Sequence, residues 1–253
     1  MKTVTVRGVT LGEGAPKICV PFVGRNEAEL LNEVANVADL DFDIIEWRVD
    51  HFEDVDKTDK VKAVAEKLRA ELGETPILFT FRSHKEGGVR DFADADYFAL
   101  NEAMIETGLV DLVDVELFMG DAGVKVVVAK ANAHNVKVVM CNHDFDATPA
   151  KEEIVKRLCM MQDLGADVCK IAVMPTSSDD VLTLLSATNE MYKEHAKCPL
   201  VTMSMGGTGM ISRLSGEIFG SAMTFGAATK ASAPGQVPVG ELRQVLDLLH
   251  RSL

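Results

Sequence analysis

A lysine stands in the middle of an apolar, β-branched stretch, residues 167–175, which reads DVCKIAVMP. The pattern predicts a buried strand that Pro175 ends. A buried lysine such as Lys170 is unfavourable unless it is neutral, paired or functional. As a neutral amine, it is a nucleophile that forms a Schiff base with a ketone or an aldehyde. The alternative is that Lys170 lies at a strand end and extends its ammonium group into water.

A histidine and a glutamate supply the groups for proton transfer. His143 ends the strand expected just before that of Lys170, so its imidazole could move protons next to a molecule bound to the amine. Glu86 lies in a charged, glycine-ended loop, residues 81–88, and could accept a hydrogen bond from His143 and fix its tautomer. The alternatives are a structural histidine and an exposed loop carboxylate.

Two loops near the C-terminal end contain groups that could bind a polar substrate. A glycine-rich turn, residues 204–209, precedes Arg213, which we expect at the start of a helix as a clamp for an anion. The segment 230–236 is rich in small residues and predicts a lid, in which Ser232 and Gln236 offer neutral hydrogen bonds. The alternatives are a solvated helix charge and an ordinary connector.

These groups need a scaffold, and strand and helix patterns alternate along the whole chain. About eight strand–helix units in one domain, residues 1–253, predict a (β/α)₈ TIM barrel. A short β-hairpin precedes it, with its turn expected at residues 12–14. The alternative, a doubly wound open sheet, favours a Gly-x-Gly-x-x-Gly turn after an early strand, and none follows the first strand. Thr148 and Ser177 are expected to cap two of the helices.

Side chains alternate between the two faces of each expected strand, so the charged residues fall on one face, late in successive strands. We predict that this face lines the barrel interior at the active-site end. The alternative is an internal ion-pair network, with Glu46–Arg48 and Arg82–Glu116 as its members. The interior set is Glu46, Arg48, Thr80, Arg82, Asp114, Glu116, Cys141, His143, Lys170, Met203 and Met205.

Composition excludes several classes of partner. A net charge of −13 argues against nucleic acid and anionic membranes, and no apolar run approaches the roughly 18 residues of a membrane helix. The N-terminus lacks the core of a signal peptide. Five scattered cysteines indicate reduced thiols in a cytoplasmic protein. Without clustered cysteines or a His-x-x-x-His pair, we expect no metal site.

Taken together, the motifs resemble type I 3-dehydroquinate dehydratase, along nearly the whole chain and in order. They are EWR at 46–48, FTFR at 79–82, EGG at 86–88, NHD at 142–144, KIAVMP at 170–175, MSMG at 203–206, SR at 212–213 and ASAPGQ at 231–236. The resemblance implies a (β/α)₈ barrel, a homodimer and a role in the shikimate pathway without a cofactor.

The resemblance also implies a mechanism. Lys170 forms a Schiff base with the ketone of 3-dehydroquinate, His143 moves the protons, and Glu86 orients His143. The residues implied to bind the substrate are Glu46, Arg48, Arg82, Arg213, Ser232, Gln236, Met203, Met205 and Phe225. Pro21 replaces a serine that some members of the family have near the substrate, which puts that one contact in doubt. Burial is expected to keep the amine neutral.

Two other functions fit part of this pattern. A Schiff-base aldolase on the same barrel would share Lys170, but it would cleave a carbon–carbon bond and bind a phosphate, for example at residues 206–209. A catalytically silent barrel that binds a sugar acid would need no covalent chemistry at Lys170.

Overall fold

Strands and helices alternate in the computed structural model of the protein, which describes residues 2–228 and 235–253. The parallel strands are β3 Lys17–Phe22, β4 Ile44–Arg48, β5 Ile77–Thr80, β6 Leu112–Glu116, β7 Lys137–Asp144, β8 Val168–Val173, β9 Leu200–Ser204, β10 Met223–Ala227 and β11 Val237–Pro238. The helices are α1 Glu27–Val37, α2 Thr58–Leu72, α3 Asp94–Ile105, α4 Asp121–Ala133, α5 Lys151–Asp163, α6 Ser178–Glu190, α7 Met210–Leu214, α8 Gly216–Phe219 and α9 Val239–His250. Three short turns are also helical: η1 Val49–His51, η2 His84–Glu86 and the π-helical η3 Met191–His195.

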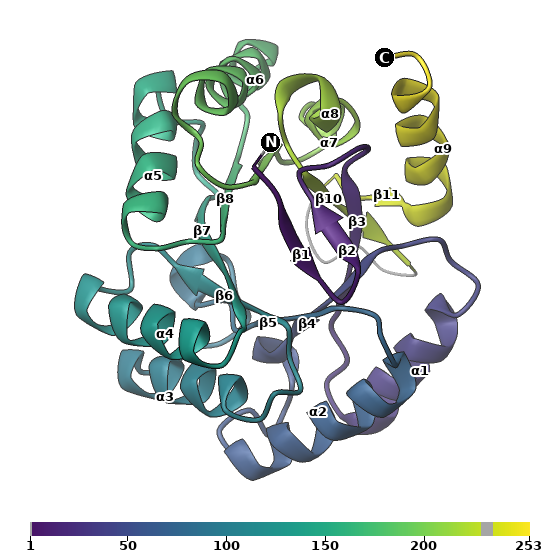
Figure 1. Ribbon diagram of the computed structural model, residues 1–253, viewed down its shortest axis with the longest axis vertical. Coiled ribbons are helices and arrows are strands. Elements are labelled where there is room, and N and C mark those ends of the chain that lie inside the picture. Colours follow the sequence, from purple (N-terminus) through teal and green to yellow (C-terminus); the bar gives the residue numbers. More distant parts are fainter. Residues whose placement is uncertain (1, 229–234) are drawn as a thin grey trace.

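The parallel strands form one curled sheet with helices around its outside (Figure 1). Its order is β11-β10-β3-β4-β5-β6-β7-β8-β9. The sheet curls back on itself, because Leu200 bridges Ser221 and the Ala222 N–H donates to the Leu200 carbonyl oxygen at 2.7 Å. The expected (β/α)₈ barrel is confirmed, with β11 as an addition that the sequence did not reveal.

A two-stranded antiparallel hairpin, β1 Val4–Val6 and β2 Val9–Leu11, lies across one opening of the ring of strands (Figure 1). The hairpin is confirmed, but its turn is Arg7-Gly8 and not residues 12–14. Both turn residues have positive φ, 42° and 81°, which matches the two-residue turn that suits the twist of a hairpin. Val6 and Leu11 join the apolar cluster inside the barrel.

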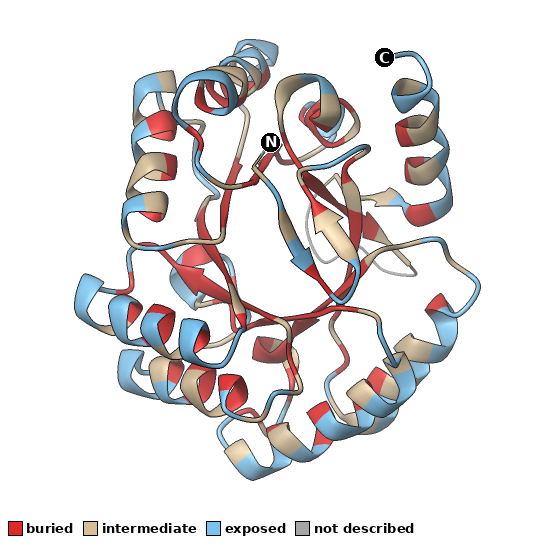
Figure 2. Cartoon of the chain, viewed as in Figure 1, coloured by how far each residue is buried: buried red, intermediate tan, exposed pale blue. Residues whose placement is uncertain are grey.

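The helices bury their inner faces against the outside of the sheet and expose their outer faces (Figure 2). Ser177 caps α6 as expected, in a capping box with Asp180. Thr148 does not cap α5, because its hydroxyl donates instead to the Met174 carbonyl oxygen at 3.0 Å and ties two loops together. The single helix expected to begin near Arg213 is two short helices, α7 and α8, separated at Ser215.

The predicted two faces of each strand are confirmed. Outward residues such as Ile45, Trp47 and Phe79 belong to the large core between sheet and helices. Inward residues at the strand starts form a second, smaller apolar cluster with the hairpin. Among the described residues, no helix combines the length and the apolar character needed to cross a membrane.

Candidate active site

A cavity of roughly 250 Å³ opens where the barrel strands end. That end carries the loops that bind ligands in parallel barrels. Every residue that the sequence analysis named as catalytic or substrate-binding lines it, except Ser232, which lies outside the described residues. Four members of the predicted interior set are buried but do not line the cavity: Thr80, Asp114, Glu116 and Cys141. The lining residues are Glu46, Arg48, Arg82, Glu86, Gly87, His143, Phe145, Lys170, Ala172, Met203, Met205, Arg213, Phe225 and Gln236.

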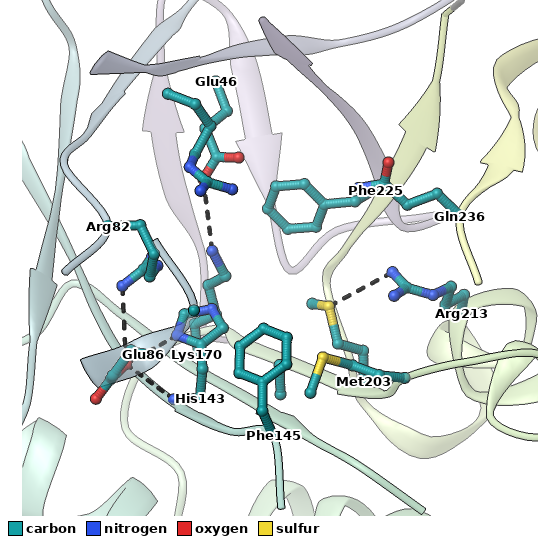
Figure 3. A pocket seen from close by; sticks show the side chains of 14 residues that line it. Glu46, Arg82, Glu86, His143, Phe145, Lys170, Met203, Arg213, Phe225 and Gln236 are labelled. Carbon is teal, nitrogen blue, oxygen red and sulfur yellow. Dashed lines mark hydrogen bonds and ion pairs between the residues drawn. The ribbon is translucent and has the colours of Figure 1, made fainter. Parts of the chain in front are cut away.

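Lys170 projects from β8 into this cavity toward Glu46 (Figure 3), and the buried carboxylate of Asp114 also lies beside its amine. Its Nζ lies 3.4 Å from Asp114 Oδ2 and 3.6 Å from Glu46 Oε1, and 4.6 Å from the centre of the Phe225 ring. Burial lowers the pKa of the amine, but Glu46 and Asp114 raise it by more, so the net pKa lies above its usual range. The expectation that burial keeps the amine neutral is therefore wrong, because the two buried carboxylates beside it favour the cation.

The imidazole of His143 lies against the Glu86 carboxylate, as the sequence predicted. His143 Nδ1 is 2.9 Å from Glu86 Oε2, which also accepts the backbone N–H of His143 at 2.9 Å. The other carboxylate oxygen, Oε1, accepts a hydrogen bond from Asn142 Nδ2 at 3.1 Å. Three contacts thus fix the carboxylate, and the carboxylate in turn fixes the imidazole ring.

Burial shifts the pKa of both partners. Burial, Arg82 and Lys170 hold the pKa of His143 well below its usual 6.5. Burial and the Glu116 carboxylate raise the pKa of Glu86 to about 8. Two groups this close titrate as one unit. With one proton, on Nδ1, the pair leaves Nε2 free to act as a base, and with two protons the pair is an acid.

Arg82 is the centre of a buried ion-pair network beneath this pair. Its Nη2 donates to Asp114 Oδ1 and its Nη1 to Glu116 Oε1, both at 2.8 Å. Glu116 also accepts hydrogen bonds from the Ser83 N–H and hydroxyl at 2.8 and 2.6 Å. The Arg82–Glu116 pair of the alternative ion-pair network is thus present, and Asp114 joins this network to the lysine.

The Glu46–Arg48 pair of the alternative ion-pair network does not form. Arg48 instead makes a bidentate ion pair with Asp50: its Nε donates to Oδ1 at 2.8 Å and its Nη2 to Oδ2 at 2.9 Å. Glu46 accepts the Thr80 hydroxyl at 3.0 Å and faces the amine of Lys170. The η1 turn after β4 causes the difference, since it folds Asp50 back beneath the guanidinium.

The opposite wall of the cavity carries another cation, Arg213 (Figure 3). Arg213 lies in the last turn of α7, not at a helix start as expected, and its Nη1 contacts Met203 Sδ at 3.5 Å. Burial lowers the pKa of Arg213 to about 10, so the guanidinium stays charged at neutral pH. Met203, Phe225 and Gln236 complete this wall.

Sequence reasoning missed three lining residues: Gly87, Phe145 and Ala172. Phe145 is partly exposed at 38% and packs over Gly87, where a Cβ atom would lie 2.4 Å from its ring. Gly87 also has a φ of 86°, which favours glycine. Phe145 could have been found from the sequence, because it is an aromatic residue two positions after His143 in a loop that follows a strand.

Among the described residues, Glu86, Cys141 and His143 place three ligand-type atoms within 4.8 Å of one another. Burial raises the pKa of the Cys141 thiol well above its usual range, so the sulfur is not a thiolate. The Arg82 guanidinium also lies 3.0 Å from that sulfur. The raised pKa makes the set a poor metal site, because metals bind the thiolate form, and the guanidinium disfavours a metal ion by like-charge repulsion.

The chain matches the family model described as Type I 3-dehydroquinase over residues 18–252. Proteins named 3-dehydroquinate dehydratase are 62% identical over 251 residues in Listeria innocua and 57% identical over 252 residues in Bacillus licheniformis. These matches cover 99% and 100% of this chain, and 99% of each relative.

Solved structures agree with the sequence matches. A type I 3-dehydroquinate dehydratase from Clostridium difficile, solved with covalently modified comenic acid, superimposes with a TM-score of 0.98. It is 56% identical, with all of both chains covered. A 3-hexulose-6-phosphate synthase at 18% identity and a TM-score of 0.59 shares the fold alone. The family match and these relatives show that the chain belongs to the type I 3-dehydroquinase family.

Proposed function

We propose that this protein dehydrates 3-dehydroquinate to 3-dehydroshikimate in the shikimate pathway, through a Schiff base on Lys170. One observation carries the proposal: a buried amine and an imidazole–carboxylate pair face the same cavity. The named activity of relatives at 62% identity supports the same reaction and substrate. The covalently modified ligand of the Clostridium difficile relative supports a nucleophile in the site.

The reaction begins when Lys170 loses a proton, and Glu46 and Asp114 are the nearest acceptors. The free amine attacks the ketone carbon, water leaves, and an iminium forms. An iminium withdraws electrons strongly, so the adjacent C–H becomes acidic enough for an imidazole base. We assign that base to His143, whose pKa is lowered and whose Nδ1 is held by Glu86.

The same imidazole then carries the proton that the departing hydroxyl needs. Loss of that hydroxyl as water leaves a conjugated iminium, and a second water hydrolyses it to the enone product and free Lys170. No net oxidation or reduction occurs, so the reaction balances without a cofactor. General acid–base catalysis of this kind contributes about 10²- to 10⁴-fold.

Substrate binding is assigned to two charged walls. Arg213 and Gln236, together with Ser232, are proposed to hold the carboxylate and a neighbouring hydroxyl. Arg48, Arg82 and Glu46 are proposed to contact the ring hydroxyls. Arg48, Arg82 and Arg213 bring cationic groups to the cavity of a protein whose net charge is −13, and an anionic substrate requires such groups. Met203, Met205 and Phe225 are proposed as the apolar walls.

The test is an assay of the purified protein with 3-dehydroquinate, followed by the ultraviolet absorbance of the conjugated enone. Borohydride reduction during turnover, with mass spectrometry of the digested protein, should add the ligand mass to the peptide that contains Lys170. No gain in absorbance would remove the dehydratase proposal. Turnover without a trapped adduct would remove the Schiff base alone. An adduct together with carbon–carbon cleavage products would favour the aldolase.

We further propose that the chain is a single catalytic domain over residues 1–253 and that it acts as a homodimer in the cytoplasm. One sheet passes from β3 to β11 without interruption, which supports a single unit. The five cysteines are free thiols, which supports a reducing compartment. Light scattering coupled to size-exclusion chromatography measures the mass that decides between monomer and dimer.

A further inference from the structure

Asp50 is fully buried just after β4, and it is not one of the residues lining the cavity. Its carboxylate accepts two hydrogen bonds from the guanidinium of Arg48, which does line the cavity. Burial raises the pKa of this carboxyl, but Arg48 and neighbouring cations lower it by more, so it is ionised at neutral pH. Such bidentate ion pairs fix the plane of a guanidinium as well as its position.

The same carboxylate also holds the loop that carries Glu86. Asp50 Oδ1 accepts the N–H of Arg82, where the loop leaves β5, at 3.4 Å. Asp50 Oδ2 accepts the N–H of Val89, where the loop ends, at 3.3 Å. Both ends of the loop therefore depend on one side chain.

The loop between these two bonds is tight, so a displaced end would move its middle. The Gly88 N–H donates to the Ser83 carbonyl oxygen at 2.8 Å, and a Cβ atom at Gly88 would lie 1.9 Å from the Arg82 carbonyl oxygen. Glu86 lies within this turn and contacts His143 from it. A shift of the loop ends is therefore passed to the general base.

We propose that Asp50 is a positioning residue that couples substrate binding at Arg48 to the orientation of the Glu86–His143 pair. It touches neither the reacting atoms nor the substrate, and it acts through the two groups that it holds. The proposal rests on the proposed function only where turnover is the readout.

The chain offers a matched control at the other end of the same strand. Asp43, just before β4, also accepts one arginine, Arg243 Nη2 at 2.8 Å, and one backbone N–H, that of Ile18 at 2.7 Å. These contacts lie at the strand start, away from the cavity. Asp43→Asn thus removes a similar structural contact without touching the loop that carries Glu86.

The experiment compares Asp50→Asn with Asp43→Asn by steady-state kinetics, borohydride trapping and thermal unfolding. The asparagine amide can accept at only one of the two oxygen positions, so Arg48 and one loop end lose a partner. Misplacement of a catalytic group by about 1 Å reduces turnover about 100-fold. We expect Asp50→Asn to lower kcat about 10- to 100-fold and to raise KM several-fold, while Lys170 is still trapped. Asp43→Asn should keep kcat and KM within twofold.

Two further measurements separate positioning from a general loss of fold. On an Arg48→Ala background, Asp50→Asn should still lower kcat but no longer raise KM, because only the loop function remains. Asp50→Glu keeps the charge but displaces it, so it should fold like the wild type and still lose kcat. Equal losses of kcat in Asp50→Asn and Asp43→Asn, or a folded Asp50→Asn with wild-type kcat, would overturn the proposal.

A readout without substrate keeps the inference independent of the reaction. The 2.9 Å contact between His143 Nδ1 and Glu86 should give a downfield imidazole proton signal in the NMR spectrum. This signal should shift or weaken in Asp50→Asn and stay unchanged in Asp43→Asn; the same spectrum in both variants would contradict the coupling. An inactive wild type that shows these NMR differences would refute the proposed function alone.

Discussion

The two halves of the barrel interior differ in chemistry although the same strands build both. The lower half, next to the hairpin, is apolar, and in five of the strands an apolar residue is followed two positions later by a buried polar, charged or thiol side chain. The pairs are Ile44 and Glu46, Leu78 and Thr80, Leu112 and Asp114, Val139 and Cys141, and Val168 and Lys170. Two residues are one repeat along a strand, so one step of about 7 Å separates a stabilising layer from a reactive one.

This difference separates stability from chemistry. Apolar side chains in the lower layer gain free energy simply by leaving water. Charges in the upper layer lose their hydration free energy, and only contacts with close partners compensate for this loss. Buried ion pairs are therefore weak evidence for stability. Arg82 lies 2.8 Å from both Asp114 and Glu116, so the three charges compensate one another. Asp114 also contacts the amine of Lys170, so this cation lies beside a buried anion. The upper layer is therefore expected to serve reactivity rather than folding.

Lys170→Met is the strongest test of this division. The variant keeps the volume of the side chain but removes the amine, so turnover should fall by at least about 10⁴-fold, as when other enzymes lose their nucleophile. Borohydride should then trap no ligand. Lys137→Met, at the first residue of the neighbouring strand β7, is the control and should keep wild-type kcat. A Lys170→Met protein with more than a tenth of wild-type turnover would refute the covalent mechanism.

His143→Ala should be the next largest effect. Loss of the general acid–base group should lower kcat about 10²- to 10⁴-fold. The amine is untouched, so borohydride should still add ligand mass to Lys170 when substrate is present. Single-turnover kinetics with trapped-adduct mass spectrometry separate the two steps. Wild-type kcat in this variant would mean that another group moves the proton.

Leu11→Ala tests the lower layer. Leu11 is fully buried in the hairpin that covers the barrel opening, and its truncation leaves a cavity. The free energy of unfolding should fall by about 2–5 kcal/mol, with kcat and KM unchanged. Denaturant titration measures the loss, and Thr5→Ala on the exposed side of the same hairpin should change stability by less than about 0.5 kcal/mol. A loss of kcat in folded Leu11→Ala would show that the layers are coupled.

Periodicity alone predicted which side chains face the interior, because successive side chains of a strand always point to opposite faces of the sheet. The pairing of those side chains was less predictable. Arg48 pairs with Asp50 rather than with Glu46, because the η1 turn bends the chain back. No local sequence pattern predicts that turn. The charge of Lys170 depends on carboxylates from β4 and β6, which lie beside it only in the folded barrel.

Glu86→Gln gives a smaller effect, on the pH dependence of stability. The pKa of Glu86 rises from 4.5 to about 8 on folding, mainly through burial. Between these values the unfolded carboxyl is ionised, while the folded Glu86–His143 pair still holds the corresponding proton. Its contribution to stability is therefore complete below pH 4.5 and is lost as the pH rises through about 8.

The glutamine side chain does not titrate, so the wild-type decline over this range, at most about 1.4 kcal/mol per pH unit, should flatten in Glu86→Gln. Denaturant unfolding at several pH values measures the slope. Glu53→Gln, at an exposed ion pair with Arg25, should keep the wild-type slope. Turnover of Glu86→Gln should fall in the same samples, because an amide cannot hold the proton on Nδ1 as firmly as a carboxylate. A wild-type slope in Glu86→Gln would show that another group of the upper layer titrates over this range. The cost in stability would then not come from the residue that positions the catalytic imidazole.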